Sequence, residues 1–277
     1  MISIIVPAYN SEKTIAACLD SLVAQTLGEK EIIVMDGLST DKTIDVIRDF
    51  AMRFPFVNYH SEKDHGIYDA INKGIRAAKG EWIYIIGSDD RLFETTTLEK
   101  VHTLMRGVNS GAVYGSVKVI GDAGWAADGE IYGGEFTLEK LVQKNICQQA
   151  VFYHRSLFEQ IGYFNINYPV CADWDFILHC AGKSSMKYIP LTIAEFYGGG
   201  TSKVVKEERF YAELASNLYA YFGLRIFKKE FAPAGGRFER LSQDYSAQGK
   251  KLKSYLFMLV AQKHKNQTPV SGKQAVD

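Results

Sequence analysis

The stretch from Trp82 to Asp90 constrains the fold more than any other part of the chain. Its first five residues, Trp82–Ile86, form a continuous apolar run rich in β-branched and aromatic side chains, which is typical of a strand buried on both faces of a parallel sheet. Gly87 ends the run, and two adjacent carboxylates, Asp89 and Asp90, follow. Because ligands of open α/β sheets bind beyond the carboxyl ends of the strands, we expect this pair to lie in a ligand site.

The residues before this run alternate between short apolar segments and segments with helical spacing. Apolar strands are predicted at residues 2–6, 31–35 and 56–59, ahead of the run at 82–86. The segment after the first strand has apolar residues at i, i+3, i+4 and i+7: Ile15, Cys18, Leu19 and Leu22. Such alternation of strands and helices implies parallel strands joined by right-handed crossovers. We therefore predict an α/β fold with a Rossmann-type, mostly parallel sheet flanked by helices.

Polar residues follow each of the four predicted strands. They are Tyr9, Asn10 and Glu12 after the first strand, Asp36 after the second, Lys63 and Asp64 after the third, and Ser88, Asp89 and Asp90 after the fourth. Four such clusters on one sheet edge indicate a nucleotide-shaped pocket, with an acid for base or ribose, a lysine for phosphate and an acid for a metal. Structural alternatives stay open: a solvated turn for the Asp pair, cover of the sheet edge for Tyr9, and a first helical turn favoured by the helix dipole for Glu12.

Charge, motifs and hydropathy exclude several classes of protein. Lys plus Arg equals Asp plus Glu at 32 each, which argues against a dedicated nucleic-acid binder. The chain has neither the G-x-G-x-x-G of dinucleotide dehydrogenases nor the G-x-x-x-x-G-K-S/T of P-loop NTPases. No apolar run reaches the roughly 18 residues of a spanning helix, and the chain starts in a strand without a basic signal segment. Without Cys-x-x-Cys spacing, we expect reduced thiols and a cytoplasmic protein.

Four segments carry a resemblance to a known family. They are Ser3-Ile-Ile-Val-Pro-Ala-Tyr-Asn10, Val34-Met-Asp-Gly-Leu-Ser-Thr-Asp41, Asp64-His-Gly-Ile-Tyr-Asp-Ala-Ile-Asn-Lys-Gly74 and Ser88-Asp-Asp90. In this order they resemble the motifs of the family 2 glycosyltransferases, and the resemblance covers roughly residues 1–200. Members of that family are inverting, nucleotide-sugar-dependent enzymes with the GT-A fold. The resemblance therefore implies a GT-A-like sheet in this chain.

The resemblance also implies a donor site at the strand ends. Its nucleotide-binding residues would be Pro7, Tyr9, Asn10 and Glu12 around the base and ribose, Asp36 on the base, typically uracil, Lys63 and Asp64 near the ribose or diphosphate, and Asp89 on the ribose or sugar. The Ser88-Asp-Asp90 turn stands at the family's Asp-x-Asp, and Ser88 departs from that pattern. Asp90 is then the expected ligand of a divalent cation, Mn²⁺ or Mg²⁺, which one carboxylate fewer would bind more weakly.

The second half supplies the expected catalytic base. Asp173 opens a helical segment and matches the Asp of the family's Glu-Asp motif, in which the Asp is the base, although Ala172 replaces the Glu. A helix N-cap is the structural alternative for Asp173, and Asp175 is the next candidate base. Cys147 stands where the family has a His. Contacts with the donor or acceptor sugar are expected for Gln148, Trp125 and Trp174.

The chain is expected to form one catalytic domain and a helical C-terminal extension. The predicted divisions are a GT-A-like domain at 1–206, with a nucleotide-binding half at 1–97 and an acceptor-binding half at 98–206, an extension at 207–265 and a disordered tail at 266–277.

Several elements are predicted within these divisions: strands at 112–114 and 117–120, a glycine-rich loop at 196–203, and helices at 208–231 and 250–265. In relatives, a loop at the position of the glycine-rich one closes over the diphosphate. The basic and aromatic content of the extension allows two interpretations, packing onto the rest of the chain or resting on a membrane surface.

Together these features predict an inverting glycosyltransferase. It would move a sugar from a nucleotide sugar, most simply a UDP-sugar, to a hydroxyl of a glycan or lipid-linked saccharide, by metal-assisted direct displacement with Asp173 as general base, in bacterial surface polysaccharide synthesis. The alternatives are a sugar nucleotidyltransferase, which would need a basic glycine-rich loop after the first strand, and a non-catalytic sugar-binding module. The expected partners are the donor and the acceptor, without nucleic acid. Peripheral contact with the cytoplasmic face of the inner membrane and homo-oligomerisation are left open.

Overall fold

The computed structural model describes residues 1–199 and 207–266. The chain forms two compact units, Met1–Glu135 with Ile146–Glu207, and Phe136–Asn145 with Glu208–Asp277. The glycine-rich loop predicted at 196–203 lies outside the described residues from position 200 on, and the predicted tail does so from position 267 on. The predicted domain boundaries stay a prediction.

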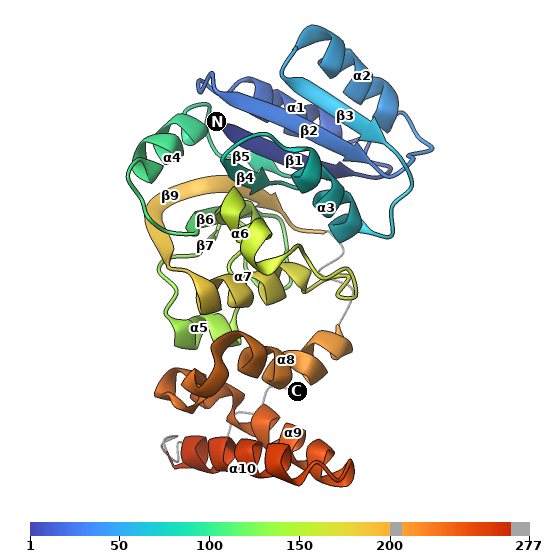
Figure 1. The fold of residues 1–277 in the computed structure, drawn as a ribbon. Helices are drawn as coiled ribbons and strands as arrows, with labels where there is room; N and C mark the ends of the chain where they lie inside the picture. Colours follow the sequence, from blue (N-terminus) through green and yellow to red (C-terminus); the bar gives the residue numbers. More distant parts are fainter. Residues whose placement is uncertain (200–206, 267–277) are drawn as a thin grey trace. The chain divides into compact units, whose positions relative to one another are not determined.

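The first half of the first unit is a parallel sheet with helical crossovers (Figure 1). Its strands lie in the order β3-β2-β1-β4 and comprise β1 (Ile2–Ala8), β2 (Lys30–Asp36), β3 (Val57–Ser61) and β4 (Trp82–Ile85). The crossover helices are α1 (Ile15–Val23), α2 (Thr43–Arg53) and α3 (Ile67–Ala77). Every residue of β1, β2 and β4 is buried, as their continuous apolar runs indicate. The predicted α/β sheet is confirmed.

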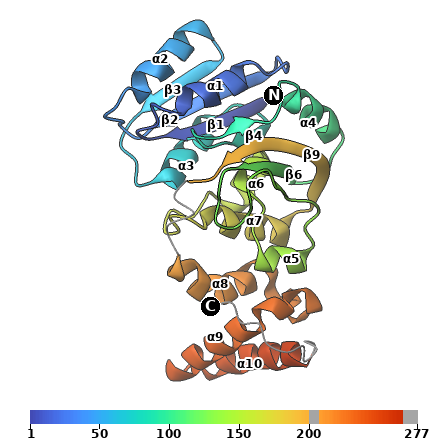
Figure 2. The same ribbon diagram turned by 180° about the vertical axis from the view of Figure 1, so that it is seen from behind.

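The second half of the sheet mixes parallel and antiparallel strands. They are β8 (Val151–His154), β6 (Ala112–Ile120), β9 (Met186–Tyr197) and β5 (Arg91–Leu92), in that order after β4, with the short β7 (Ile131–Tyr132) beside β6. Figure 2 shows β6 and β9 side by side, and they pair in parallel. The strands predicted at 112–114 and 117–120 are one strand, whose register against β9 shifts next to Gly115. A Cβ on Gly115 would clash with the Leu191 carbonyl, so glycine permits the close approach of the two strands.

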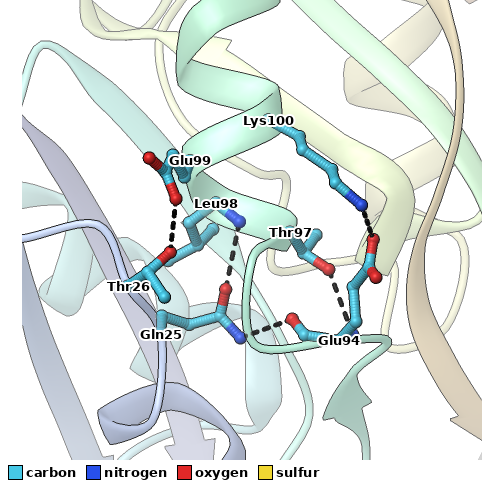
Figure 3. A network of polar contacts seen from close by, with 7 residues as sticks. All are labelled: Gln25, Thr26, Glu94, Thr97, Leu98, Glu99 and Lys100. Carbon is cyan, nitrogen blue, oxygen red and sulfur yellow. Dashed lines mark hydrogen bonds and ion pairs between the residues drawn. The ribbon is translucent and has the colours of Figure 1, made fainter.

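A buried polar network holds the segment after Asp90 in place. Its centre is Gln25, which is 5% exposed and lies just past α1. Gln25 Nε2 donates to the Glu94 carbonyl at 2.8 Å, and Oε1 accepts from the Leu98 amide at 3.0 Å. Leu98 lies in the first turn of α4 (Thr97–Met105), where backbone amides lack helical partners, so Gln25 caps this helix. Figure 3 shows the network: Gln25, Thr26, Glu94, Thr97, Leu98, Glu99 and Lys100.

Among the described residues of the first unit, three further helices lie in the part of the chain between β7 and β9. They are the 3-10 helix η1 (Gln148–Ala150), α6 (Arg155–Ile161) and α7 (Ala172–Lys183). The start of α7 falls where the sequence predicts a helix to begin, next to Asp173.

The second unit is helical. It contains α5 (Leu138–Gln143), α8 (Glu208–Phe222), the 3-10 helices η3 (Gly223–Phe227) and η4 (Lys229–Ala234), α9 (Gly235–Ala247) and α10 (Lys251–Lys265). The single helix predicted over 208–231 is wrong, because α8 ends at Phe222 and Gly223 has φ 55°, outside the right-handed helical region. Buried aromatic side chains form the core of this unit: Phe210, Phe231, Phe238 and Phe257. Within the described ranges, no helix has the length and hydropathy needed to cross a bilayer.

Candidate active site

The loops after β1 and β2 are tied together by the side chains of two predicted donor-site residues. Asn10 Oδ1 accepts from the Thr40 amide at 2.9 Å, and Glu12 Oε2 accepts from the Lys42 amide at 3.1 Å. Asn10 has φ 48°, a left-handed conformation that Asn tolerates better than most residues. The sequence predicted Asn10 and Glu12 beside one another at this edge, and the structure adds that both stabilise the neighbouring loop.

Asp36 ends β2 and is 2% exposed, with both carboxylate oxygens engaged by hydroxyls. Ser39 Oγ donates to Oδ1 at 2.5 Å, and Ser61 Oγ donates to Oδ2 at 2.6 Å. These donors compensate the burial of the charge. Neither serine was predicted as a site residue, although Ser39 lies three residues after the end of β2 and Ser61 ends β3. Each carboxylate oxygen of Asp36 can accept a further hydrogen bond, and a contact with a nucleotide base would use this remaining capacity.

Tyr9 and Asp64 meet at Gly37. A Cβ on Gly37 would lie 2.5 Å from Asp64 Oδ2 and 3.4 Å from Tyr9 Cδ2, so only glycine fits between them. The Tyr9 ring is 63% exposed and presents a face to solvent at this edge. Lys63 is also exposed, whereas Pro7 is buried within β1. The structure therefore brings three strand ends together, with Tyr9 as their outermost aromatic side chain.

The turn after β4 buries the carboxylate of Asp90 and leaves that of Asp89 half-buried. Asp90 is 1% exposed, and its Oδ1 accepts from the Tyr197 amide at 2.8 Å. Burial, and secondarily the neighbouring Asp89, raise the pKa of Asp90 to about 8, and burial also raises the pKa of Asp89. A Cβ on Gly87 would lie 2.6 Å from Asp89 Oδ1 and 2.8 Å from Asp90 Oδ2. Both carboxylates therefore face a common space that only a glycine leaves open.

This donor set fits a divalent cation that also binds a diphosphate. Carboxylate oxygens are hard ligands, and Mg²⁺ commonly takes one or two of them together with substrate phosphates. In the described part of the chain, no three His, Cys, Asp or Glu side chains cluster as a metal cage. Asp90 would hold such a cation, and phosphate oxygens would complete its coordination.

Gln149, which the sequence analysis did not select, contacts Asp90. Its Nε2 donates to Asp90 Oδ2 at 2.5 Å, and its Oε1 accepts from Cys147 Sγ at 3.0 Å. Gln148, the predicted sugar contact, instead accepts from the Tyr153 hydroxyl at 3.1 Å through Oε1, and its Nε2 is buried with no hydrogen-bond partner among the described residues. In the sequence, the pair of adjacent glutamines pointed to a polar contact at this position. Only the structure shows that Gln149, and not Gln148, contacts Asp90.

Asp173 lies in the first turn of α7. Its Oδ1 accepts from the Trp174 amide at 2.8 Å. Burial raises the pKa of Cys147, and the charges of Asp90 and Asp173 both add to that increase. Cys147 is linked to Asp90 through the Gln149 side chain, and the charge of Asp173 also contributes to its raised pKa.

The predicted aromatic contacts occupy different environments. Trp125 is 43% exposed, and its ring centroid lies 4.7 Å from that of Tyr132 and 5.2 Å from that of Phe196. Trp174 is 8% exposed within α7. Trp125 therefore offers a supported, accessible ring, whereas Trp174 packs in the interior.

Comparisons with known proteins identify relatives of this chain. The chain is 37% identical over 214 residues to the PGL/p-HBAD biosynthesis glycosyltransferases of Mycobacterium bovis and Mycobacterium tuberculosis, a match covering 75% of this chain and 82% of theirs. It is 26% identical to the chondroitin synthase of Escherichia coli, over 68% of this chain but 28% of that enzyme.

Two solved structures share the fold. TarS of S. aureus in complex with UDP-GlcNAc has a TM-score of 0.61 at 18% identity, covering 98% of this chain and 93% of TarS. The mannosyltransferase PcManGT of Pyrobaculum calidifontis, in complex with GDP-Man and Mn²⁺, has a TM-score of 0.58 at 19% identity, covering 99% of this chain and 76% of that enzyme. The sheet is thus that of a GT-A glycosyltransferase. The sequence matches the family described as Glycosyl transferase family 2 over residues 3–162, and the chain, with its strand-end acids in this fold, belongs to that family of transferases.

Proposed function

We propose that this protein is an inverting glycosyltransferase that uses a UDP-sugar as donor and a hydroxyl of a glycan or lipid-linked saccharide as acceptor. The observation that carries the proposal is that Asn10, Asp36 and Asp90 each end or follow a parallel strand on one edge of a GT-A sheet, where the loops after β1 and β2 are hydrogen-bonded to each other. The family assignment favours glycosyl transfer over the alternatives of nucleotidyl transfer and non-catalytic sugar binding.

The transfer is a direct displacement at the anomeric carbon. As the acceptor oxygen forms its bond to that carbon, Asp173 takes the hydroxyl proton, and the bond to the diphosphate breaks with both electrons leaving on the diphosphate. A neutral hydroxyl is a poor nucleophile until its proton is leaving, so a positioned base is required. Inversion follows because the acceptor attacks the face opposite the leaving group.

The donor is held at the strand ends. Tyr9, Asn10 and Asp36 would contact base and ribose, while Asp64 and Asp89 would lie toward the ribose, diphosphate and sugar. A divalent cation bound at this site would neutralise the charge that develops on the departing diphosphate. Its presence would also favour the ionised form of Asp90, whose pKa burial otherwise raises to about 8.

The names of the relatives support the choice of substrates. The mycobacterial relatives act in PGL/p-HBAD biosynthesis and the Escherichia coli relative makes chondroitin, which supports a saccharide or lipid-linked acceptor in surface polysaccharide synthesis. One structural neighbour binds UDP-GlcNAc and another binds GDP-Man with Mn²⁺. Uridine is therefore the first base to test and guanosine the second.

A binding panel tests the proposal. We expect calorimetry to show saturable binding of UDP-glucose, UDP-GlcNAc or UDP-galactose that strengthens on adding Mn²⁺ or Mg²⁺, with GDP-mannose and dTDP-glucose binding less tightly. Binding of nucleoside triphosphates in preference to every nucleotide sugar would instead support the nucleotidyltransferase. An absence of binding to the whole panel would contradict the proposed donor class.

We also propose that α10 rests peripherally on the cytoplasmic face of an anionic membrane, bringing the enzyme to a lipid-linked acceptor. Leu252, Tyr255 and Leu259 follow one another at helical spacing on α10 and are 88%, 57% and 36% exposed. Lys251 and Lys263 flank this stripe on the same exposed side. An outward apolar stripe bordered by lysines suits the boundary between headgroups and acyl chains. Two copies meeting at this stripe would bring like charges together, which disfavours it as a homodimer interface.

A further inference from the structure

The first turn of α7 is held from two sides by side chains distant in the sequence. Tyr68, the second residue of α3, donates its hydroxyl hydrogen bond to the Val170 carbonyl at 2.9 Å. Its ring stacks on Phe164 with centroids 5.6 Å apart, which supports the direction of the phenol. From the other side, Glu207 Oε2 accepts from the amides of Val170 at 2.9 Å and Cys171 at 2.6 Å.

These contacts compensate groups that the helix itself leaves unpaired. Backbone amides at a helix start have no intrahelical acceptor, and a carboxylate there is favoured by the helix dipole. Glu207 is 6% exposed, so its two hydrogen bonds form away from bulk water. Both polar groups of the Val170 backbone are bound by side chains, and the turn that carries Asp173 has a defined position.

The Tyr68 phenol also reaches Asp173 directly. The hydroxyl lies close enough to Asp173 for the backbone and the side chain of Asp173 both to affect the pKa of the phenol. Burial, followed by the charge of Asp173, raises the pKa of Tyr68 well above its usual value, so the phenol stays protonated and remains a donor. The single proton of the phenol is donated to the Val170 carbonyl, and the Asp173 carboxylate beside it is an alternative acceptor.

Several titratable groups face Asp173 or its turn from the surrounding elements. They are Tyr68 of α3, Tyr132 of β7, Cys147 before η1, Tyr153 of β8, Cys171 at the α7 N-cap and Glu207 after β9. Burial raises the pKa of each tyrosine and cysteine in this set, so they are neutral at working pH. Glu207 is the carboxylic acid of the set, and its Oε2 accepts from the amides of Val170 and Cys171.

We propose that Tyr68 and Glu207 are positioning residues for the base: the phenol inserted from α3 holds the Asp173 carboxylate in one orientation, and Glu207 fixes the helix turn that carries it. This inference rests on the proposed role of Asp173. The two residues act on the carboxylate with opposite sign, because a donated hydrogen bond stabilises its charged form and a neighbouring negative charge destabilises it.

The test uses hydrolysis of the UDP-sugar that binds best in the panel above, with water in place of the acceptor and release of UDP as the readout. Tyr68→Phe is expected to lower kcat about tenfold, leave the donor KM unchanged and move the acidic limb of the kcat/KM profile up by about one pH unit. Glu207→Gln keeps one acceptor for the helix amides but removes the charge, so the acidic limb is expected to move to lower pH. Thermal unfolding of both variants controls for the fold.

A double variant separates this inference from the proposed base. Tyr68→Phe should add no further loss to Asp173→Asn, because its effect passes through the Asp173 carboxylate. If Asp173→Asn is inactive while Tyr68→Phe keeps the original kcat and acidic limb, the positioning role is overturned and the base stands. If both positioning variants lose activity with an unmoved limb, their role is structural and the inference is wrong. If Asp173→Asn itself keeps its rate, the base assignment fails.

Discussion

The carboxyl group of Asp90 is buried, yet it has to meet a charged ligand in the proposed reaction. Its pKa of about 8 lies above the ordinary value of about 3.9 for Asp. Between these two values the folded protein retains a proton that the unfolded chain releases. Unfolding therefore releases protons in this window, and the contribution of Asp90 to stability, present below pH 4, falls as the pH rises toward 8.

We predict that the metal-free protein loses this contribution between pH 5 and pH 8, whereas Asp90→Asn does not. Asparagine keeps the shape of the side chain but has no titratable proton, so the difference between the two proteins isolates Asp90. Urea unfolding in EDTA at both pH values measures the free energy of unfolding. Parallel pH dependences for the two proteins would contradict the buried, proton-retaining state of Asp90.

Asp173 is the residue on which the chemistry depends. Asp173→Asn preserves the shape of the side chain and an oxygen that accepts the Trp174 amide, but it removes the basicity. We therefore predict a loss of transfer of about 10²–10⁴-fold, with nucleotide binding and thermal stability retained. Initial rates and calorimetry on the same preparation check both parts. Transfer near the original rate would exclude Asp173, and Asp175 would be the next base to test.

At the scale of elements, the site depends on how tightly the chain turns after β4. Gly87 lies between that strand and the two acids, and a Cβ there would approach both carboxylates within 2.8 Å. Gly28, in the loop between α1 and β2, offers a matched comparison because a Cβ there would meet nothing within 4 Å. Neither glycine has a positive φ, so substitution tests space rather than backbone conformation.

We predict that Gly87→Ala displaces Asp89 or Asp90 and lowers Mn²⁺-stimulated turnover at least about tenfold, which corresponds to an activation barrier higher by about 1.4 kcal/mol. Overpacking should also cost about 1–3 kcal/mol of stability. Gly28→Ala should change neither quantity. The measurements are a Mn²⁺ titration of turnover and urea unfolding. Equal behaviour of the two variants would show that the space beside Gly87 is not needed.

At the scale of the whole molecule, the second unit presents apolar side chains that its own core does not cover. Phe238 and Phe257 are buried between α9 and α10, whereas Leu252 and Tyr255 on the same α10 remain largely exposed. When a helix has apolar residues on its outward side as well as on its inward side, burying the outward side requires a second contact surface. The proposed membrane contact supplies one.

We predict that the full chain sediments with vesicles of phosphatidylglycerol and phosphatidylcholine at low salt and is released at high salt, because screening weakens the attraction of lysines to anionic lipid. Replacing Leu252, Tyr255 and Leu259 together by serine should abolish sedimentation. Met52→Ser, at an 81% exposed apolar residue of α2, is the control that should leave sedimentation unchanged. A wild-type chain that stays in the supernatant, or that sediments only as a self-associated dimer, would contradict membrane contact.

The sequence by itself determined the strands, the crossovers and the edge on which the site lies. Continuous apolar runs can be buried only inside a sheet covered on both faces, and parallel strands must bring their carboxyl ends to one edge. Asn10, Asp36 and Asp90 were predictable for that reason. The end of α8 was also predictable in principle from Gly223, although the aromatic residues that follow favoured a longer helix.

Only the tertiary structure decided the contacts between distant segments. Gln149 rather than Gln148 reaches Asp90, and Tyr68 and Glu207 meet at one helix turn from positions 139 residues apart. Local spacing cannot specify such contacts, because they depend on how β8 pairs with β4 and on where the chain returns after β9. The physical reason is that burial patterns are local, whereas hydrogen bonds of buried polar groups are satisfied by whichever segment the packing brings near.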